Sequence, residues 1–110
     1  PDIKTRLNII HGNSIHHREA PQAVADGHAD AAVVFYHLGL HYIRLFPDLF
    51  EMVPLGGTKD KPRPHKGNVI GHTHMALAGD GGTYGRSLIN FFMSKIVHKI
   101  YQYHGLIPLN

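Results

Sequence analysis

A continuous run of apolar residues, from Ala31 to Tyr36, constrains the fold of this chain more than any other feature. The run has the length of a strand, and it contains no polar residue that would face water. Strands with this pattern are buried on both faces and are typical of parallel sheets that helices cover. The run therefore predicts a layered α/β fold.

The segments around this run support the same architecture. Three further strands are predicted from short apolar stretches bounded by turn residues, at Leu7–Ile10, Phe50–Leu55 and Asn68–Ala78. Helices are predicted to start between Arg18 and Pro21 and end at Gly27, and to cover His37–Phe46 and Tyr84–His104. This alternation implies a small, partly parallel sheet flanked by helices, in a single domain over residues 1–110.

Composition excludes several classes of protein. The chain has no cysteine, so it holds no disulfide and no thiolate ligand or nucleophile. It also lacks the run of about 18 apolar residues that a membrane span needs. The formal net charge is +3, and the only dense group of cations runs from Lys59 to Lys66. No aromatic residue interrupts that group to stack on bases, so we expect a solvated loop and no nucleic-acid partner.

The start of the first helix is rich in donors of hydrogen bonds. His16, His17 and Arg18 precede that helix, and Tyr36 and His37 follow the apolar run. Helix starts carry unpaired N–H groups and a partial positive charge, and these residues would add charge-assisted hydrogen bonds. We therefore expect a bound anion here. The alternative is that the three basic side chains form a solvated cap.

Histidine spacing raises a second possibility, a divalent metal site. His37 and His41 lie four residues apart, which places two imidazoles on one face of a helix. His72 and His74 alternate along the last predicted strand, so both would point to one side. No His-Glu-x-x-His motif accompanies them.

No pattern of a catalytic site is present, so we do not expect an enzyme. Ser14 and Ser87 are outside any Gly-x-Ser-x-Gly elbow, and no pair of carboxylates stands out as acid and base. The glycine-rich stretch Gly79–Gly82 matches neither the dinucleotide fingerprint nor the lysine-bearing phosphate loop. We expect no cofactor.

Two segments together resemble a known family. The first runs from His16 to Tyr36 and includes the turn Gly27-His28-Ala29-Asp30, and the second runs from Ser87 to Pro108. They are similar to the second lobe of type II periplasmic substrate-binding proteins, in the branch of the molybdate- and tungstate-type ABC transporter receptors. The resemblance implies the C-terminal part of such a receptor, with the first lobe missing.

The resemblance also implies how a ligand would be held. An oxyanion would be gripped by N–H groups at helix starts, here at His17 and Arg18, and by an aromatic hydroxyl at the position of Phe35 or Tyr36. The partners would be a small anion and the membrane subunits of an ABC transporter. An incomplete lobe exposes apolar surface, so we expect a homo-oligomer, formed by pairing of open strand edges.

The leading functional hypothesis is therefore non-catalytic binding of a small oxyanion such as molybdate or tungstate. A histidine-rich binder of divalent metal and a ligand-sensing domain of a regulator are the alternatives. The receptor hypothesis implies a periplasmic or extracytoplasmic location if the full-length parent carries a signal peptide.

Overall fold

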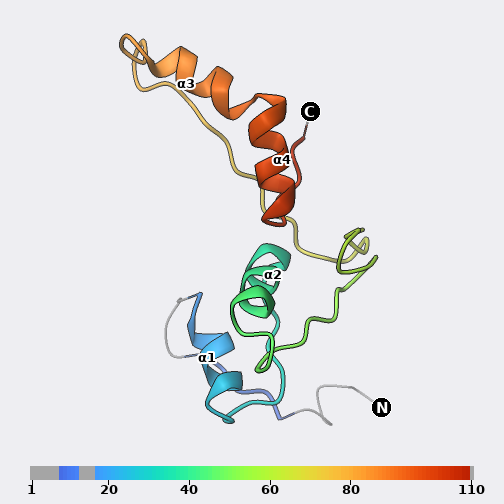
Figure 1. Ribbon diagram of the computed structural model, residues 1–110. Coiled ribbons are helices and arrows are strands. Elements are labelled where there is room, and N and C mark those ends of the chain that lie inside the picture. Colours follow the sequence, from blue (N-terminus) through green and yellow to red (C-terminus); the bar gives the residue numbers. More distant parts are fainter. Residues whose placement is uncertain (1–7, 13–16, 110) are drawn as a thin grey trace. The chain divides into compact units, whose positions relative to one another are not determined.

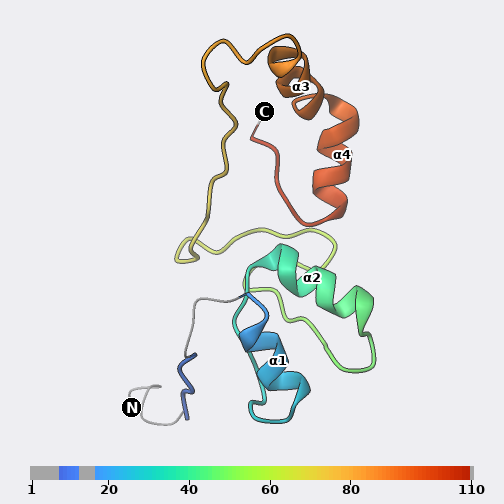
Figure 2. The same cartoon turned by 90° about the vertical axis from the view of Figure 1, so that its left-hand side faces the viewer.

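The computed structural model describes residues 8–12 and 17–109, and Figures 1 and 2 show it from two sides. The helices in these residues are α1 (Glu19–Ala25), α2 (Tyr36–Leu45), α3 (Gly85–Phe92) and α4 (Lys95–Tyr103). The chain separates into two compact units, which we call unit 1 (Pro1–Glu51) and unit 2 (Met52–Asn110). Unit 1 contains α1 and α2, and unit 2 contains α3 and α4.

The predicted α/β fold with a partly parallel sheet is wrong. Residues 8–12 and 17–109 contain four helices and no β-strand, and their one β-contact is an isolated antiparallel bridge between Gly57 and Pro62. Of the predicted strands, Leu7 lies outside the described residues. The other positions are irregular, at residues 8–10, 31–35, 50–55 and 68–78, and Tyr36 belongs to α2.

The missing partners of these strands explain the difference. An apolar run forms a strand only when neighbouring backbone pairs with it and other elements cover its faces. No described segment pairs with residues 31–35, and the side chain of Val33 is 86% exposed. Residues 69–76 are likewise exposed along their whole length, with Val69 at 84%. The apolar pattern is present, but nothing in the described chain completes a sheet around it.

Helix α1 ends at a glycine, as the sequence predicts. The amide of Gly27 donates to the carbonyl of Val24 (3.1 Å), and the amide of His28 donates to that of Ala23 (2.8 Å). These two bonds form a Schellman motif, which needs a residue with positive φ, and Gly27 has a φ of +74°. Gly105 ends α4 in the same way, with a φ of +85°.

Helix α2 confirms the predicted helix over His37–Phe46 to within one residue at each end. Phe35 precedes it in extended backbone, and its side chain makes no capping hydrogen bond. Pro47 follows the last turn and cannot continue the helix, since it lacks an N–H. Leu40, in the middle of α2, is buried.

The single helix predicted from Tyr84 to His104 is two helices, and Figure 1 shows the chain changing direction between them. Ser94 adopts extended backbone at the junction, with a ψ of 157°. Its hydroxyl oxygen accepts a hydrogen bond from the amide of Val97 (3.4 Å), so it caps the start of α4. Val97 is buried, and α3 and α4 contact each other.

Residues 55–68 of unit 2 form a closed loop, which we call the basic loop because it contains Lys59, Lys61, Arg63 and Lys66. The amide of Thr58 donates to the carbonyl of Lys61 (3.0 Å), and the side-chain amide of Asn68 donates to the carbonyl of Leu55 (2.6 Å). All four basic residues are exposed, which confirms the predicted exposed loop. Backbone bonds therefore order the loop while its cations reach solvent.

Buried side chains are few. Among the described residues only Pro21, Leu40 and Val97 are buried, and many large apolar side chains are exposed. Unit 1 and unit 2 therefore depend strongly on local hydrogen bonds, such as the helix caps, because neither has a deep apolar core.

The Schellman motif at Gly27 yields a test of this dependence. A Gly27→Ala substitution forces a side chain into positive φ, at a cost of about 1–2 kcal/mol, although a methyl group there would meet no neighbour within 4 Å. We expect the amides at the end of α1 to exchange with solvent about 5–30-fold faster. Gly71→Ala is the control, because its space is equally open and its φ is not positive. Equal exchange in both variants, measured by NMR, would contradict the role of this cap.

Candidate functional site

The N-terminal end of α2 holds two of the residues singled out from sequence, Tyr36 and His37. The first hydrogen bonds of the helix come from the amides of Leu38 and Gly39, both of which donate to the carbonyl of Phe35 (3.0 Å each). The amides of Tyr36 and His37 therefore precede the first helical hydrogen bond. They lie where the partial positive charge of the helix dipole concentrates.

His37 is half-buried beside an aromatic ring. Its imidazole stacks on the ring of Phe35, with ring centroids 5.8 Å apart and planes 20° from parallel. Burial lowers the pKa of His37 below the ordinary 6.5, because a charged imidazole loses hydration there. The nearby positive charge of His17 lowers the same pKa further. Two residues that are distant in sequence therefore share one electrostatic environment.

His17 and Arg18 lie in the turn that leads into α1, and both side chains are exposed. The carbonyl of Arg18 accepts the first hydrogen bond of the helix, from the amide of Gln22 (2.9 Å). His16 lies outside the described residues. His17 is close enough to His37 for its charge to lower the pKa of that imidazole. The structure places Tyr36 in the first turn of a helix, however, and not at the end of a strand.

The histidines of the metal hypothesis fall into two separate sets. His37 and His41 are one turn apart on α2, and His41 is exposed, with its ring edge-on to Tyr42 at 5.8 Å. His72 and His74 lie in irregular, exposed chain in unit 2, so they do not alternate along a strand. In the part of the chain that the structure describes, no group of three or more His, Cys, Asp or Glu is placed to hold an ion.

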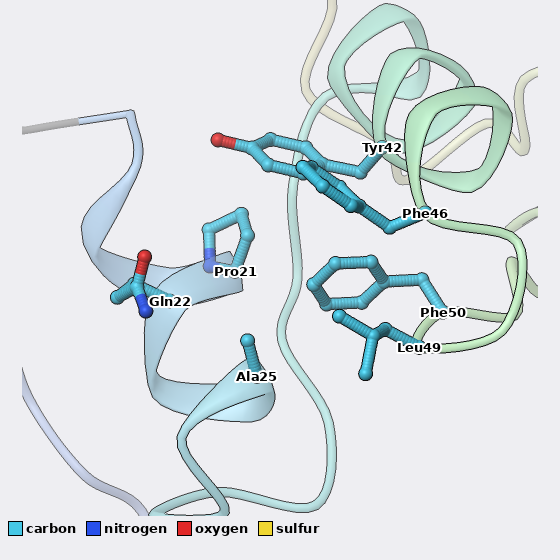
Figure 3. Close-up of a pocket in the computed structure, with 7 residues that line it drawn as sticks. All are labelled: Pro21, Gln22, Ala25, Tyr42, Phe46, Leu49 and Phe50. Atoms are coloured by element: carbon cyan, nitrogen blue, oxygen red, sulfur yellow. The ribbon is translucent and has the colours of Figure 1, made fainter.

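An apolar hollow of about 210 Å³ lies between α1 and the end of α2, as Figure 3 shows. Its lining residues are Pro21, Gln22, Ala25, Tyr42, Phe46, Leu49 and Phe50. Phe50 meets Tyr42 edge-on at 5.6 Å and Phe46 at 6.3 Å, so the three rings form one aromatic cluster. Tyr42 and Phe46 are one turn apart in the predicted helix over His37–Phe46, but the hollow depends on α1 and was not predicted.

A second hollow, of about 490 Å³, lies in unit 2 between residues 74–78 and α3. Gly81 and Gly85 line it, and a side chain at either position would collide with the side chain of Leu77. Of the predicted site residues, only His74 reaches this hollow. Its walls are chiefly apolar, and no Lys or Arg lines it.

Charge is divided unevenly between the units. Residues 1–51 contain four Lys or Arg and six Asp or Glu. Residues 52–110 contain seven Lys or Arg and two Asp or Glu. The positive balance of the whole chain therefore arises in unit 2.

No protein-family model matches the chain, and comparisons with curated proteins and with solved structures give no match either. Within residues 8–12 and 17–109, none of the helices is long and apolar enough to cross a membrane.

The pKa of His37 provides a direct test of its surroundings. We expect a pKa below 6.5 in an NMR titration, and His17→Gln should raise it because the repulsion of a neighbouring cation disappears. His41→Gln is the control and should leave the pKa of His37 unchanged. A pKa of His37 that does not respond to His17→Gln would show that the two imidazoles do not interact.

The same shift makes the stability of unit 1 depend on pH. Because the pKa of His37 is lower in the folded chain, the unfolded chain binds the proton more readily. The free energy of unfolding should therefore fall as pH drops below about 6.5, and should be independent of this group at higher pH. A His37→Gln variant should lose this part of the acid sensitivity, which urea unfolding at pH 5 and pH 8 would measure.

Proposed function

We propose that unit 1 binds a small oxyanion at the N-terminal end of α2, without catalysing a reaction. The observation that carries this proposal is the position of His37 in the first turn of α2, at the positive end of the helix dipole, where burial and the charge of His17 both lower its pKa. An anion placed there would accept hydrogen bonds from the imidazoles and from the first-turn amides. It would also cancel the repulsion between the two imidazoles.

Arg18 and Tyr36 would complete the site. Arg18 is next to His17 in the turn before α1, and a guanidinium binds oxyanions through two parallel N–H groups. Tyr36 occupies the first position of α2 and brings a phenolic hydroxyl to the same end of the helix. These four residues supply donors and no carboxylate, which favours an anion over a metal ion.

The motif resemblance to molybdate- and tungstate-type receptors supports the choice of ligand class. In that proposal the tetrahedral oxyanion is the cargo, and the membrane subunits of an ABC transporter are the partners. The location is periplasmic or extracytoplasmic if the full-length parent carries a signal peptide. The chain would supply one wall of the binding site. The rest of the site would come from a lobe that resembles the first half of such receptors.

Calorimetric titration with molybdate, tungstate and sulfate tests the binding. We expect heat of binding at pH 5 that weakens at pH 8, because the His37 imidazole loses its charge as pH rises through a pKa that lies below 6.5. Arg18→Ala should weaken binding about tenfold or more, since it removes a charge-assisted hydrogen bond. Arg44→Ala removes the same charge from the last turn of α2 and is the matched control. Heat with zinc alone, lost in His37→Gln and His41→Gln, would favour the metal alternative.

We also propose that the chain self-associates through unit 1. The strand edges expected to pair are not formed in the described residues, but Phe46 and Leu49 beside the apolar hollow are exposed. Exposed apolar surface of this kind favours association. Sedimentation velocity should show a mass that rises with concentration, and Leu49→Asp should shift the chain toward the monomer. A monomer at all concentrations would contradict this proposal.

A further inference from the structure

We propose that α4 is a docking surface for an anionic lipid membrane, on which the helix lies flat. This surface, which we call the α4 stripe, consists of Ile96, Ile100 and Tyr103 together with Lys95 and Lys99. It belongs to unit 2, so it is independent of the anion site proposed in unit 1.

The apolar part of the α4 stripe is exposed. Ile96, Ile100 and Tyr103 recur at positions i, i+4 and i+7, which places them on one face of the helix. Their side chains are 70%, 51% and 62% exposed. Val97, about 100° around the helix from Ile96, is buried, so the exposed face is not the one that packs within the unit.

The charged part of the stripe is entirely positive. Lys95 and Lys99 are one turn apart and exposed, and helical geometry places them along one edge of the apolar face. At the other end His104 follows the helix, with its ring edge-on to that of Tyr103 at 5.1 Å. From residue 81 to residue 110 the sequence contains no Asp or Glu. A partner that complements this surface is therefore apolar and negatively charged.

A second copy of the chain fits this surface poorly. Pairing two α4 helices would bring the lysines of one copy near those of the other, and this part of the chain has no carboxylate to separate them. Like charges in such a contact oppose association. The exposed face is consequently not explained by self-pairing of α4.

An anionic membrane surface meets each requirement. Apolar side chains enter the boundary of the acyl chains while lysines remain among the headgroups, as in other interfacial amphipathic helices. The ring of Tyr103 suits this boundary, because it has an apolar body and a polar tip. The excess of cations over acids in residues 52–110 attracts the whole unit to the same surface. The α4 stripe is short, and a fluid membrane can receive it without a preformed groove.

Vesicle flotation tests this proposal with the full chain at low concentration. We expect the chain to float with vesicles of mixed phosphatidylcholine and phosphatidylserine and to stay behind with phosphatidylcholine alone. The double variant Lys95→Gln, Lys99→Gln should reduce the partition coefficient about 30-fold, since each lysine near an anionic surface contributes about fivefold. Ile100→Ser should reduce it as well, through loss of the apolar contact.

The matched control is the double variant Lys61→Gln, Lys66→Gln, which removes the same charge from the exposed basic loop. It should lose clearly less binding than the α4 variant. Circular dichroism checks that each variant keeps its helices, which we expect because the substituted side chains are exposed. Absence of flotation, equal flotation with both kinds of vesicle, or equal loss in the two double variants would overturn the proposal.

Discussion

In unit 1, α1 and the end of α2 meet at the apolar hollow that Pro21 shares with the aromatic cluster of Tyr42, Phe46 and Phe50. Pro21 is one of the few buried residues of the described chain, so this apolar packing adds to the local hydrogen bonds of the unit. Because α1 is short, fixing its position also fixes the turn that precedes it. The approach of His17 to His37 thus depends on apolar packing that involves neither histidine.

Helix positions could be predicted from the sequence because their signals are local. Gly27 and Gly105 end helices through their own φ angles, and Pro47 ends one by lacking an N–H. The break at Ser94 was equally local, since serine is a strong N-cap residue, but a single helix was predicted across it, from Tyr84 to His104. Capping residues inside an apparently continuous helix therefore need the same attention as those at its ends.

Strands and the candidate site could not be predicted in this way. A strand depends on backbone elsewhere in the chain, and the apolar run that ends at Tyr36 carries no information on whether a partner exists. The sequence did place basic and hydroxyl groups near the start of α2. Their mutual geometry depends on how α1 packs, so the nearness of His17 and His37, and the stacking of Phe35 on His37, emerged only from the structure.

The exposed segment 69–76 makes the chain susceptible to proteolysis. Proteases bind their substrates as extended peptides and cut most readily where exposed chain lies outside helices and sheets. This segment meets both conditions, whereas hydrogen bonds begin again at Gly81, whose amide donates to the carbonyl of Ala78 (3.0 Å). The first cleavage by a protease of broad specificity should therefore fall between the basic loop and α3. The fragment released would carry both helices of unit 2 with their caps intact.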